Sequence, residues 1–312
     1  PPPPPRPAPP GCAGRTNPFP VAPTPPWGAP PPISGAPPPT LSSRHPDPAD
    51  PQPHRQRHIA ESFGADVDRY DRARPRYPQA LIDRIATRPG LEVLDVGTGT
   101  GIAARQLRDA GCRVLGVEPD ERMADHARRT GIDTEVATFE EWDPAGRAFD
   151  AVTAAQSWHW VDPVAGAAKA ARILRPRGRL AVFAHVIAPP QPIARAQLNA
   201  LRRVMPESPF AQQSDASPER AAELYRTGME KFADGIRDSG GFGHPEQWRF
   251  DWQRPYTRAE WLDLAPTTGA LTRLPQDELA ELLAEVGAAI DGLGGSFTMH
   301  YVTLAVAAVR TE

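Results

Sequence analysis

Residues 91–101, LEVLDVGTGTG, join a short and mostly apolar run to three glycines that alternate with threonines. The run at 91–96 has the length and the branched residues of a buried strand, and a helical pattern begins at Gly101. Glycines between a strand and a helix allow a tight turn and a close approach of the backbone to a ligand. The N-terminus of the helix adds unpaired N–H groups and a positive dipole end. This stretch predicts a cofactor site at the end of a strand.

Strand and helix patterns alternate on both sides of this stretch. Helical patterns lie at 59–70, 79–86, 101–110, 120–130 and 163–174, and strand patterns at 113–117, 133–137, 149–155 and 179–187. Such alternation predicts a parallel sheet that is covered on both faces. Helical pieces at 193–204 and 218–237 have no strand between them, which predicts a helical cap insert over 189–245. Strand patterns return at 247–252 and 297–309, with helices at 257–265 and 276–290.

The fold class that follows is α/β. We expect a Rossmann-like, mostly parallel, seven-stranded sheet with helices on both faces, a helical insert after strand five and an antiparallel C-terminal strand. The first 53 residues hold 23 of the 40 prolines and almost no aliphatic clusters. A segment of this composition buries too little apolar surface to offset its ordering entropy. We therefore expect a disordered proline-rich tail at 1–58 and a single domain at 59–312.

Composition excludes several kinds of partner. The chain has a net charge of −3, and because residues 1–58 hold five arginines and two acidic residues, the remainder is more acidic than the whole. A net-acidic domain argues against nucleic acid as the main partner. The two cysteines, Cys12 and Cys112, predict neither a disulfide framework nor a metal site. No apolar run reaches the roughly 18 residues of a membrane helix, and the N-terminus does not resemble a signal peptide, so we expect a cytoplasmic protein.

Two acidic residues accompany the glycines. Glu118 lies 21 residues after Gly97, at the end of the second predicted strand, where a carboxylate can accept both hydroxyls of a ribose. Asp95 lies beneath the glycines, and its alternative role is to cap N–H groups of the loop. A dinucleotide site would have its third glycine one residue later, and Asp95 would repel a pyrophosphate. A nicotinamide-dependent oxidoreductase is therefore the weaker reading, and the chain also lacks a Tyr-x-x-x-Lys pair.

Four segments together resemble a known family. Residues 93–101, with Glu118 and Met123 downstream, resemble the first two motifs of class I S-adenosylmethionine-dependent methyltransferases. Residues 70–78 (YDRARPRYP), 155–162 (AQSWHWVD) and 170–179 (AARILRPRGR) resemble further segments of the methyltransferase type 11 branch, which includes trans-aconitate methyltransferase-like proteins. The resemblance covers about residues 60–187 and implies S-adenosylmethionine as the cofactor.

The resemblance also implies roles for single residues. The glycines would pack around the methionine part of the cofactor, Met123 would touch the adenine, and Gln156 would lie near the sulfonium. Thr138, Phe139 and Glu140 would frame the adenine edge. Arg74 could pair with the cofactor's carboxylate or with an acidic substrate, since guanidinium binds carboxylate bidentately. The full set of expected cofactor-binding residues is Tyr70, Arg74, Asp95, Gly97, Thr98, Gly99, Thr100, Gly101, Glu118, Met123, Thr138, Phe139, Glu140 and Gln156.

Methyl transfer from a sulfonium is an in-line displacement, so the protein mainly supplies alignment. A carboxylate acceptor needs no base, whereas a hydroxyl acceptor can need one, and His159 is the candidate. Its alternative role is packing within the Trp158–Trp160 cluster. We expect a small-molecule methyl acceptor between the 189–245 insert, the Tyr70–Tyr77 segment and the end of strand four. A catalytically idle cofactor-binding domain is the remaining alternative.

Overall fold

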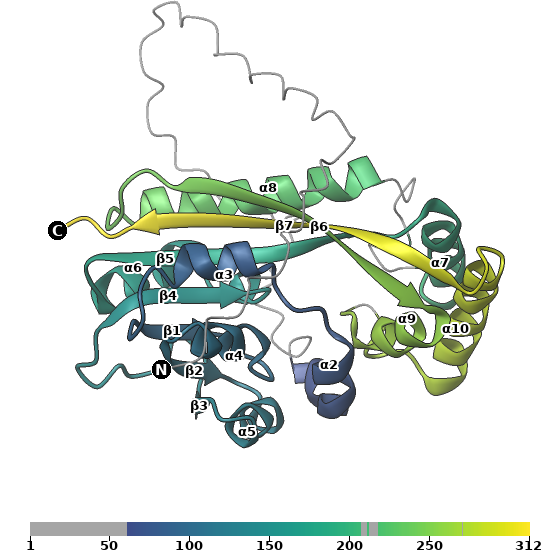
Figure 1. Ribbon diagram of the computed structural model, residues 1–312, viewed down its shortest axis with the longest axis horizontal. Coiled ribbons are helices and arrows are strands. Elements are labelled where there is room, and N and C mark those ends of the chain that lie inside the picture. Colours follow the sequence, from purple (N-terminus) through teal and green to yellow (C-terminus); the bar gives the residue numbers. More distant parts are fainter. Residues whose placement is uncertain (1–60, 207–210, 212–217, 270) are drawn as a thin grey trace, which may run out of the picture. The chain divides into compact units, whose positions relative to one another are not determined.

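A seven-stranded sheet forms the centre of the described domain in the computed structural model, which describes residues 61–206, 211, 218–269 and 271–312 (Figure 1). The strand order is β3-β2-β1-β4-β5-β7-β6. Strands β1 to β5 pair in parallel, and β7 pairs antiparallel with both β5 and β6. The predicted fold class is therefore confirmed, while the predicted tail at 1–58 lies outside the described residues. The strands are β1 (Glu92–Val96), β2 (Arg113–Glu118), β3 (Asp133–Val136), β4 (Phe149–Ala155), β5 (Leu174–Ala188), β6 (Glu246–Thr257) and β7 (Ser296–Val309).

Helices cover both faces of the sheet because neighbouring residues of each strand point to opposite sides. Val93 of β1 packs in a cluster with α3 (Gln79–Ile85) and α4 (Ile102–Asp109). Leu94, the next residue, packs in a cluster with α6 (Pro163–Ile173) and α8 (Pro218–Asp238) on the other face. Helix α5 (Glu121–Arg129) joins the α4 side through Ala127 and Ala104. Both faces of the central strands are therefore buried, which agrees with the nearly continuous apolar sequence of these strands.

The long strands β5, β6 and β7 extend beyond this core and carry a second apolar cluster. It is formed with α7 (Gln191–Val204), α9 (Arg258–Leu264) and α10 (Gln276–Asp291), and α7 packs on α10. Helix α8 instead packs on α6 and against β5 and β7. The two helices of the predicted 189–245 insert therefore lie in different layers, and the bounds of that insert stay a prediction.

Strand β6 is longer than the sequence indicated. The predicted strand at 247–252 continues through Pro255 to Thr257, paired throughout with β7. Proline lacks an N–H and usually interrupts a ladder, but β6 is the last strand of the sheet and has only one paired side. The continuation carries Trp252 and Arg254 away from the sheet centre, toward the segment that follows α2 (Val67–Ala73).

Local sequence features determine where α2 ends and where α5 begins. The short 3₁₀ helix Glu61–Asp66 precedes α2, and α2 ends at Ala73 because Arg74, which precedes Pro75, is extended at φ −62° and ψ 140°. Asp120 accepts a hydrogen bond from the backbone N–H of Arg122 and caps α5.

Candidate functional site

The glycine loop, residues 97–101, joins β1 to α4 and folds back over the end of β2. Its three glycines have φ values of +63°, +57° and +89°, a left-handed backbone that other residues rarely adopt. The N–H groups of Gly97 and Thr98 donate to the carbonyl oxygen of Val117, at 2.8 and 3.2 Å. The sequence between the strand and the helix thus determines this turn because only glycine adopts its backbone without strain.

Asp95 fixes the glycine loop from below. Its side chain is fully buried, and its two carboxylate oxygens accept hydrogen bonds of 2.7 Å from the hydroxyls of Thr98 and Thr153. Burial raises its pKa to about 6. The donors are hydroxyl groups and not the loop N–H groups of the alternative considered above. A contact of Asp95 with a cofactor stays a prediction.

Glu118 ends β2 directly beside the loop, as the parallel arrangement of β1 and β2 requires. One carboxylate oxygen accepts the N–H of Gly99 at 2.8 Å, and the other accepts the N–H of Asp120 at 3.0 Å. Burial raises its pKa to about 7. Each carboxylate oxygen has two lone pairs, so this carboxylate can still accept hydrogen bonds from two ligand hydroxyls.

The space beside Gly99 is open. A β-carbon on Gly99 would have Met123 Sδ, 3.9 Å away, as its nearest neighbour, whereas one on Gly97 would lie 2.5 Å from the β-carbon of Ser157. The Gly99 side of the loop is therefore where another molecule can approach the backbone. Three groups beside Gly99 suit ribose and adenine. They are the accessible backbone of Gly99, the Glu118 carboxylate with its free lone pairs and the thioether of Met123. The residues present fit S-adenosylmethionine.

The residues predicted at the adenine edge follow β3 and make contacts of their own. Phe139 is buried, with its ring centroid 6.1 Å from that of Trp158. The side chain of Glu140 accepts the backbone N–H of Asp162 at 3.3 Å, and the Thr138 hydroxyl donates to Glu141 at 2.9 Å. The Phe139–Trp158 contact and the Glu140–Asp162 bond connect the segments that follow β3 and β4. Contacts of the three residues with adenine stay predictions.

Gln156 and His159 follow the end of β4. Gln156 has φ +60°, a strained value for a residue other than glycine, and its N–H donates to Phe183 of β5 at 2.9 Å. Such strain collects at functional sites. His159 lies in a 3₁₀ turn with its ring 4.6 Å from that of Trp160, and burial lowers its pKa to about 4. The imidazole is thus neutral at physiological pH, and both its roles, base and packing residue, stay open.

The N-terminal segment is tied to the rest of the site by contacts that the sequence did not indicate. Asp71 of α2 pairs with Arg105 of α4 at 2.6 Å, and Arg105 also donates to the carbonyl of Thr100 in the glycine loop at 2.7 Å. The guanidinium carbon of Arg74 lies 4.8 Å from the centroid of the Tyr70 ring, and the guanidinium donates a hydrogen bond to the backbone carbonyl of Thr267. Asp71 and Arg105 have no distinguishing sequence pattern because each is an ordinary polar residue of a short helix.

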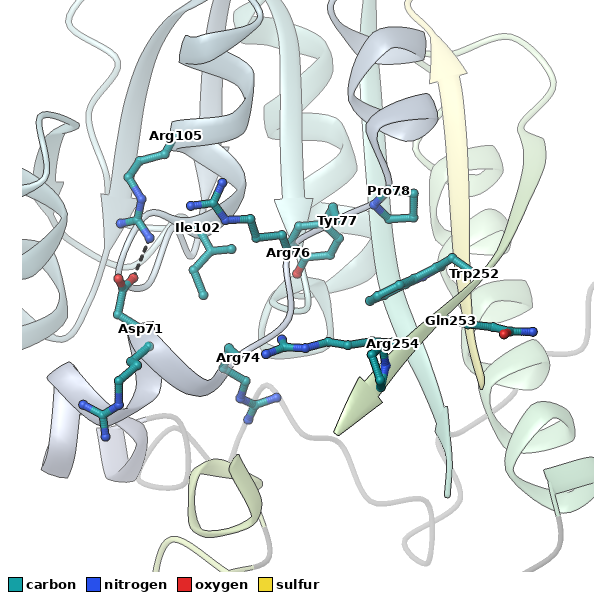
Figure 2. Close-up of a pocket in the computed structure, with 12 residues that line it drawn as sticks. Asp71, Arg74, Arg76, Tyr77, Pro78, Ile102, Arg105, Trp252, Gln253 and Arg254 are labelled. Carbon is teal, nitrogen blue, oxygen red and sulfur yellow. Dashed lines mark hydrogen bonds and ion pairs between the residues drawn. The ribbon is translucent and has the colours of Figure 1, made fainter. Parts of the chain in front are cut away.

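An aromatic cluster beside this segment was also not predicted. His185 of β5 is buried, stacks on the Tyr77 ring at 4.4 Å and bonds the Thr303 hydroxyl at 2.9 Å. Trp252 of β6 donates to the same hydroxyl at 2.9 Å and stacks on Tyr301 at 4.3 Å. Tyr77 and Trp252 line a cavity of about 650 Å³ that Figure 2 shows. None of the glycine loop, Glu118, Gln156 or His159 lines it.

The described part of the chain holds neither a cluster of metal ligands nor a membrane-spanning helix. There, histidine, cysteine and acidic side chains do not gather in threes as metal ligands would. Each helix of that part is also too short or too polar to cross a membrane.

The strand order, the glycine loop and the acid at the end of β2 define a Rossmann-like cofactor-binding domain. Comparison with known proteins specifies it further: the family model described as a methyltransferase domain matches residues 70–293, so the chain belongs to this family of S-adenosylmethionine-dependent methyltransferases. S-adenosylmethionine is the cofactor of the family. The nicotinamide-dependent alternative is not supported.

Single relatives match a smaller part of the chain. An uncharacterized methyltransferase of Mycobacterium tuberculosis H37Rv is 41% identical over 128 residues, which are 40% of this chain and 52% of the relative. A ubiquinone biosynthesis O-methyltransferase of Methylocella silvestris is 36% identical over 31% of this chain and 41% of its own length. The chain thus spans about half the length of the curated relatives that it matches. A solved structure assigned to a type II methyltransferase of Anaeromyxobacter dehalogenans has the same fold, with a TM-score of 0.51 and 23% identity over 76% of this chain and 97% of its own.

Proposed function

We propose that this protein transfers the methyl group of S-adenosylmethionine to an oxygen of a small organic acceptor, either a carboxylate or a hydroxyl. The bound cofactor supplies an electrophilic methyl group, and the chain supplies alignment for an in-line displacement. The similarity to the O-methyltransferase of Methylocella silvestris supports oxygen as the acceptor atom.

The acceptor is proposed to lie between α8, the Tyr70–Tyr77 segment and the end of β4. One observation carries this placement. Tyr225 of α8 packs against the apolar cluster that holds Trp158, just after β4. Burial raises the Tyr225 pKa, and the positive charge of Arg74 opposes the rise. These two interactions support an acceptor site bordered by three segments that are distant in sequence.

The cofactor's contacts are part of this proposal. Gly99 and its neighbours Thr98 and Thr100 would present backbone, Glu118 would accept the ribose hydroxyls, and Met123 would pack on the adenine. The other residues proposed at the cofactor are Tyr70, Arg74, Asp95, Gly97, Gly101, Thr138, Phe139, Glu140 and Gln156. The support is their position at the carboxyl ends of parallel strands, where ligands of open α/β sheets bind.

His159 is proposed as the proton acceptor for a hydroxyl acceptor. Its imidazole is neutral because burial lowers its pKa to about 4, so it can take a proton without first losing one. A base of such low pKa is weak, which favours an acceptor that ionises easily. A carboxylate acceptor would not use it.

We also propose the narrower family branch and the domain bounds. The segments at 70–78, 155–162 and 170–179 support the methyltransferase type 11 branch with trans-aconitate methyltransferase-like proteins. The methyltransferase domain is proposed to be residues 59–312, with a cap insert at 189–245.

The test is turnover with labelled S-adenosylmethionine and pools of small carboxylic acids and phenols, with S-adenosylhomocysteine formation as the signal. If Arg74 pairs with an acidic acceptor, Arg74→Ala should mainly raise KM, whereas if it pairs with the cofactor's carboxylate, the same change should weaken S-adenosylhomocysteine binding. The matched control is Arg249→Ala, because Arg249 is exposed and pairs with Asp251 on β6. Tight cofactor binding with no methylated product in any pool would support the idle domain instead.

A further inference from the structure

Five arginine side chains line the cavity of about 650 Å³ next to the proposed methyl-transfer site. Figure 2 shows it between α4 on one side and β6 on the other, with the segment from Asp71 to Pro78 across it. The arginines are Arg72, Arg74, Arg76, Arg105 and Arg254, and Asp71 is the one acidic residue among the described lining residues.

Two of these arginines have acidic partners. Arg72 donates from two nitrogens to the two carboxylate oxygens of Asp263, both at 3.0 Å. Arg105 pairs with Asp71 at 2.6 Å. These two charges are therefore balanced by carboxylates of the protein itself.

Neither Arg76 nor Arg254 forms an ion pair with a carboxylate within the described ranges, although the charge of Arg254 helps to lower the pKa of Glu260. Arg76 is exposed, and the guanidinium of Arg254 lies 4.6 Å from the centroid of the Tyr256 ring. Arg74 adds a third positive charge, and its buried Nε has no hydrogen-bond partner among the described residues. Figure 2 shows Arg76 and Arg254 reaching across the cavity toward the side of α4.

Positive charges brought together in a concave surface repel one another and attract anions. This concentration stands out because the chain as a whole carries a net negative charge. A guanidinium binds phosphate or carboxylate through two parallel hydrogen bonds. Two guanidiniums that form no ion pair with the described carboxylates therefore suit a ligand with two acidic groups or one doubly charged group.

We propose that this cavity, the anion groove, binds a small molecule with at least two negative charges, a phosphate compound or a dicarboxylate, held by Arg76 and Arg254. The groove shares Arg74 with the proposed cofactor site, but no residue of the glycine loop and neither Glu118 nor Gln156 lines it. The rings of Tyr77 and Trp252 line the same cavity and offer apolar surface to the rest of the ligand.

The test is titration calorimetry of the full chain with pyrophosphate and with malonate at low ionic strength. We expect one anion per chain, with affinity lowered about tenfold or more when Arg76→Gln and Arg254→Gln are combined, because each removes charge-assisted hydrogen bonds. Arg249→Gln is the matched control on β6, with the same loss of charge outside the groove. Tighter binding of pyrophosphate would indicate a phosphate ligand, and tighter binding of malonate a dicarboxylate.

The affinity for S-adenosylhomocysteine should be unchanged in all these variants, which separates the groove from the cofactor site. Arg76→Gln alone carries the test if the double variant does not fold, since this side chain is exposed. The proposal fails if wild-type protein binds neither anion, or if Arg249→Gln weakens binding as much as the groove variants do.

Discussion

Replacing Glu118 with glutamine tests the cofactor site with little change in shape. The carboxylate accepts the N–H groups of Gly99 and Asp120 and is nearly buried, at 7% exposure. Glutamine keeps the size of the side chain but has one acceptor oxygen and an NH₂ group where the second oxygen was. One backbone N–H then loses its partner, and the negative charge is lost.

The effect on folding is small because two changes oppose each other. A carboxyl pKa raised from 4.5 to about 7 means that burial of the charged form costs about 3 kcal/mol well above pH 7. Glutamine removes this cost but leaves a buried N–H without an acceptor, which costs about 1–3 kcal/mol. We therefore expect the free energy of unfolding to change by less than about 2 kcal/mol at pH 8.

The effect on cofactor binding is large. Hydrogen bonds to a charged acceptor contribute about 1.5–3 kcal/mol each, so losing one or more from the ribose should weaken S-adenosylhomocysteine binding about tenfold to a hundredfold. Calorimetry at pH 8 measures this, with Glu121→Gln, an exposed acid of α5, as the matched control. Wild-type affinity in Glu118→Gln would refute the assignment of Glu118 to the ribose.

The same reasoning fixes a pH dependence. Below about pH 7 the wild-type carboxyl becomes protonated and loses its charge, so S-adenosylhomocysteine affinity should fall as the pH drops through 7. In Glu118→Gln this pH dependence should disappear. A wild-type affinity that stays constant from pH 8 to pH 6 would contradict the prediction.

Four further substitutions test the surrounding structure. Gly97→Ala places a β-carbon 2.5 Å from that of Ser157 at φ +63°, so it should lower Tm by roughly 5–10 °C, and Gly99→Ala, which is strained but not crowded, by less. If His159 is the base, His159→Gln should lower kcat without changing the cofactor affinity. The kcat of the wild-type protein should then fall only near pH 4, where the imidazole becomes protonated. An unchanged kcat in His159→Gln would leave packing as the role of His159. Arg105→Ala removes the 2.6 Å ion pair with Asp71 of α2, so the rate of amide hydrogen exchange in α2 should rise. An unchanged exchange rate would show that this ion pair does not hold α2 in place.

The sequence by itself determined the class of sheet and predicted the centre of the proposed cofactor site. The glycine loop and Glu118 are found from local pattern because each follows a strand, and parallel strands place their carboxyl ends at one edge. The 2.8 Å bond between Gly99 and Glu118 is the direct result. The seven strands were likewise readable, since their apolar runs are bounded by glycine and by polar turns.

Only the tertiary structure decided which polar residues meet across the fold. Asp71 and Arg105 pair across 34 residues, and Arg76 and Arg254 share one cavity although 178 residues separate them. No periodicity or motif links such positions, because their proximity depends on how far β6 continues past Pro255 and on where the segment after α2 crosses it. Sequence patterns report the strand or helix that a residue forms and the face it occupies, whereas the packing of separate elements determines which charges have partners.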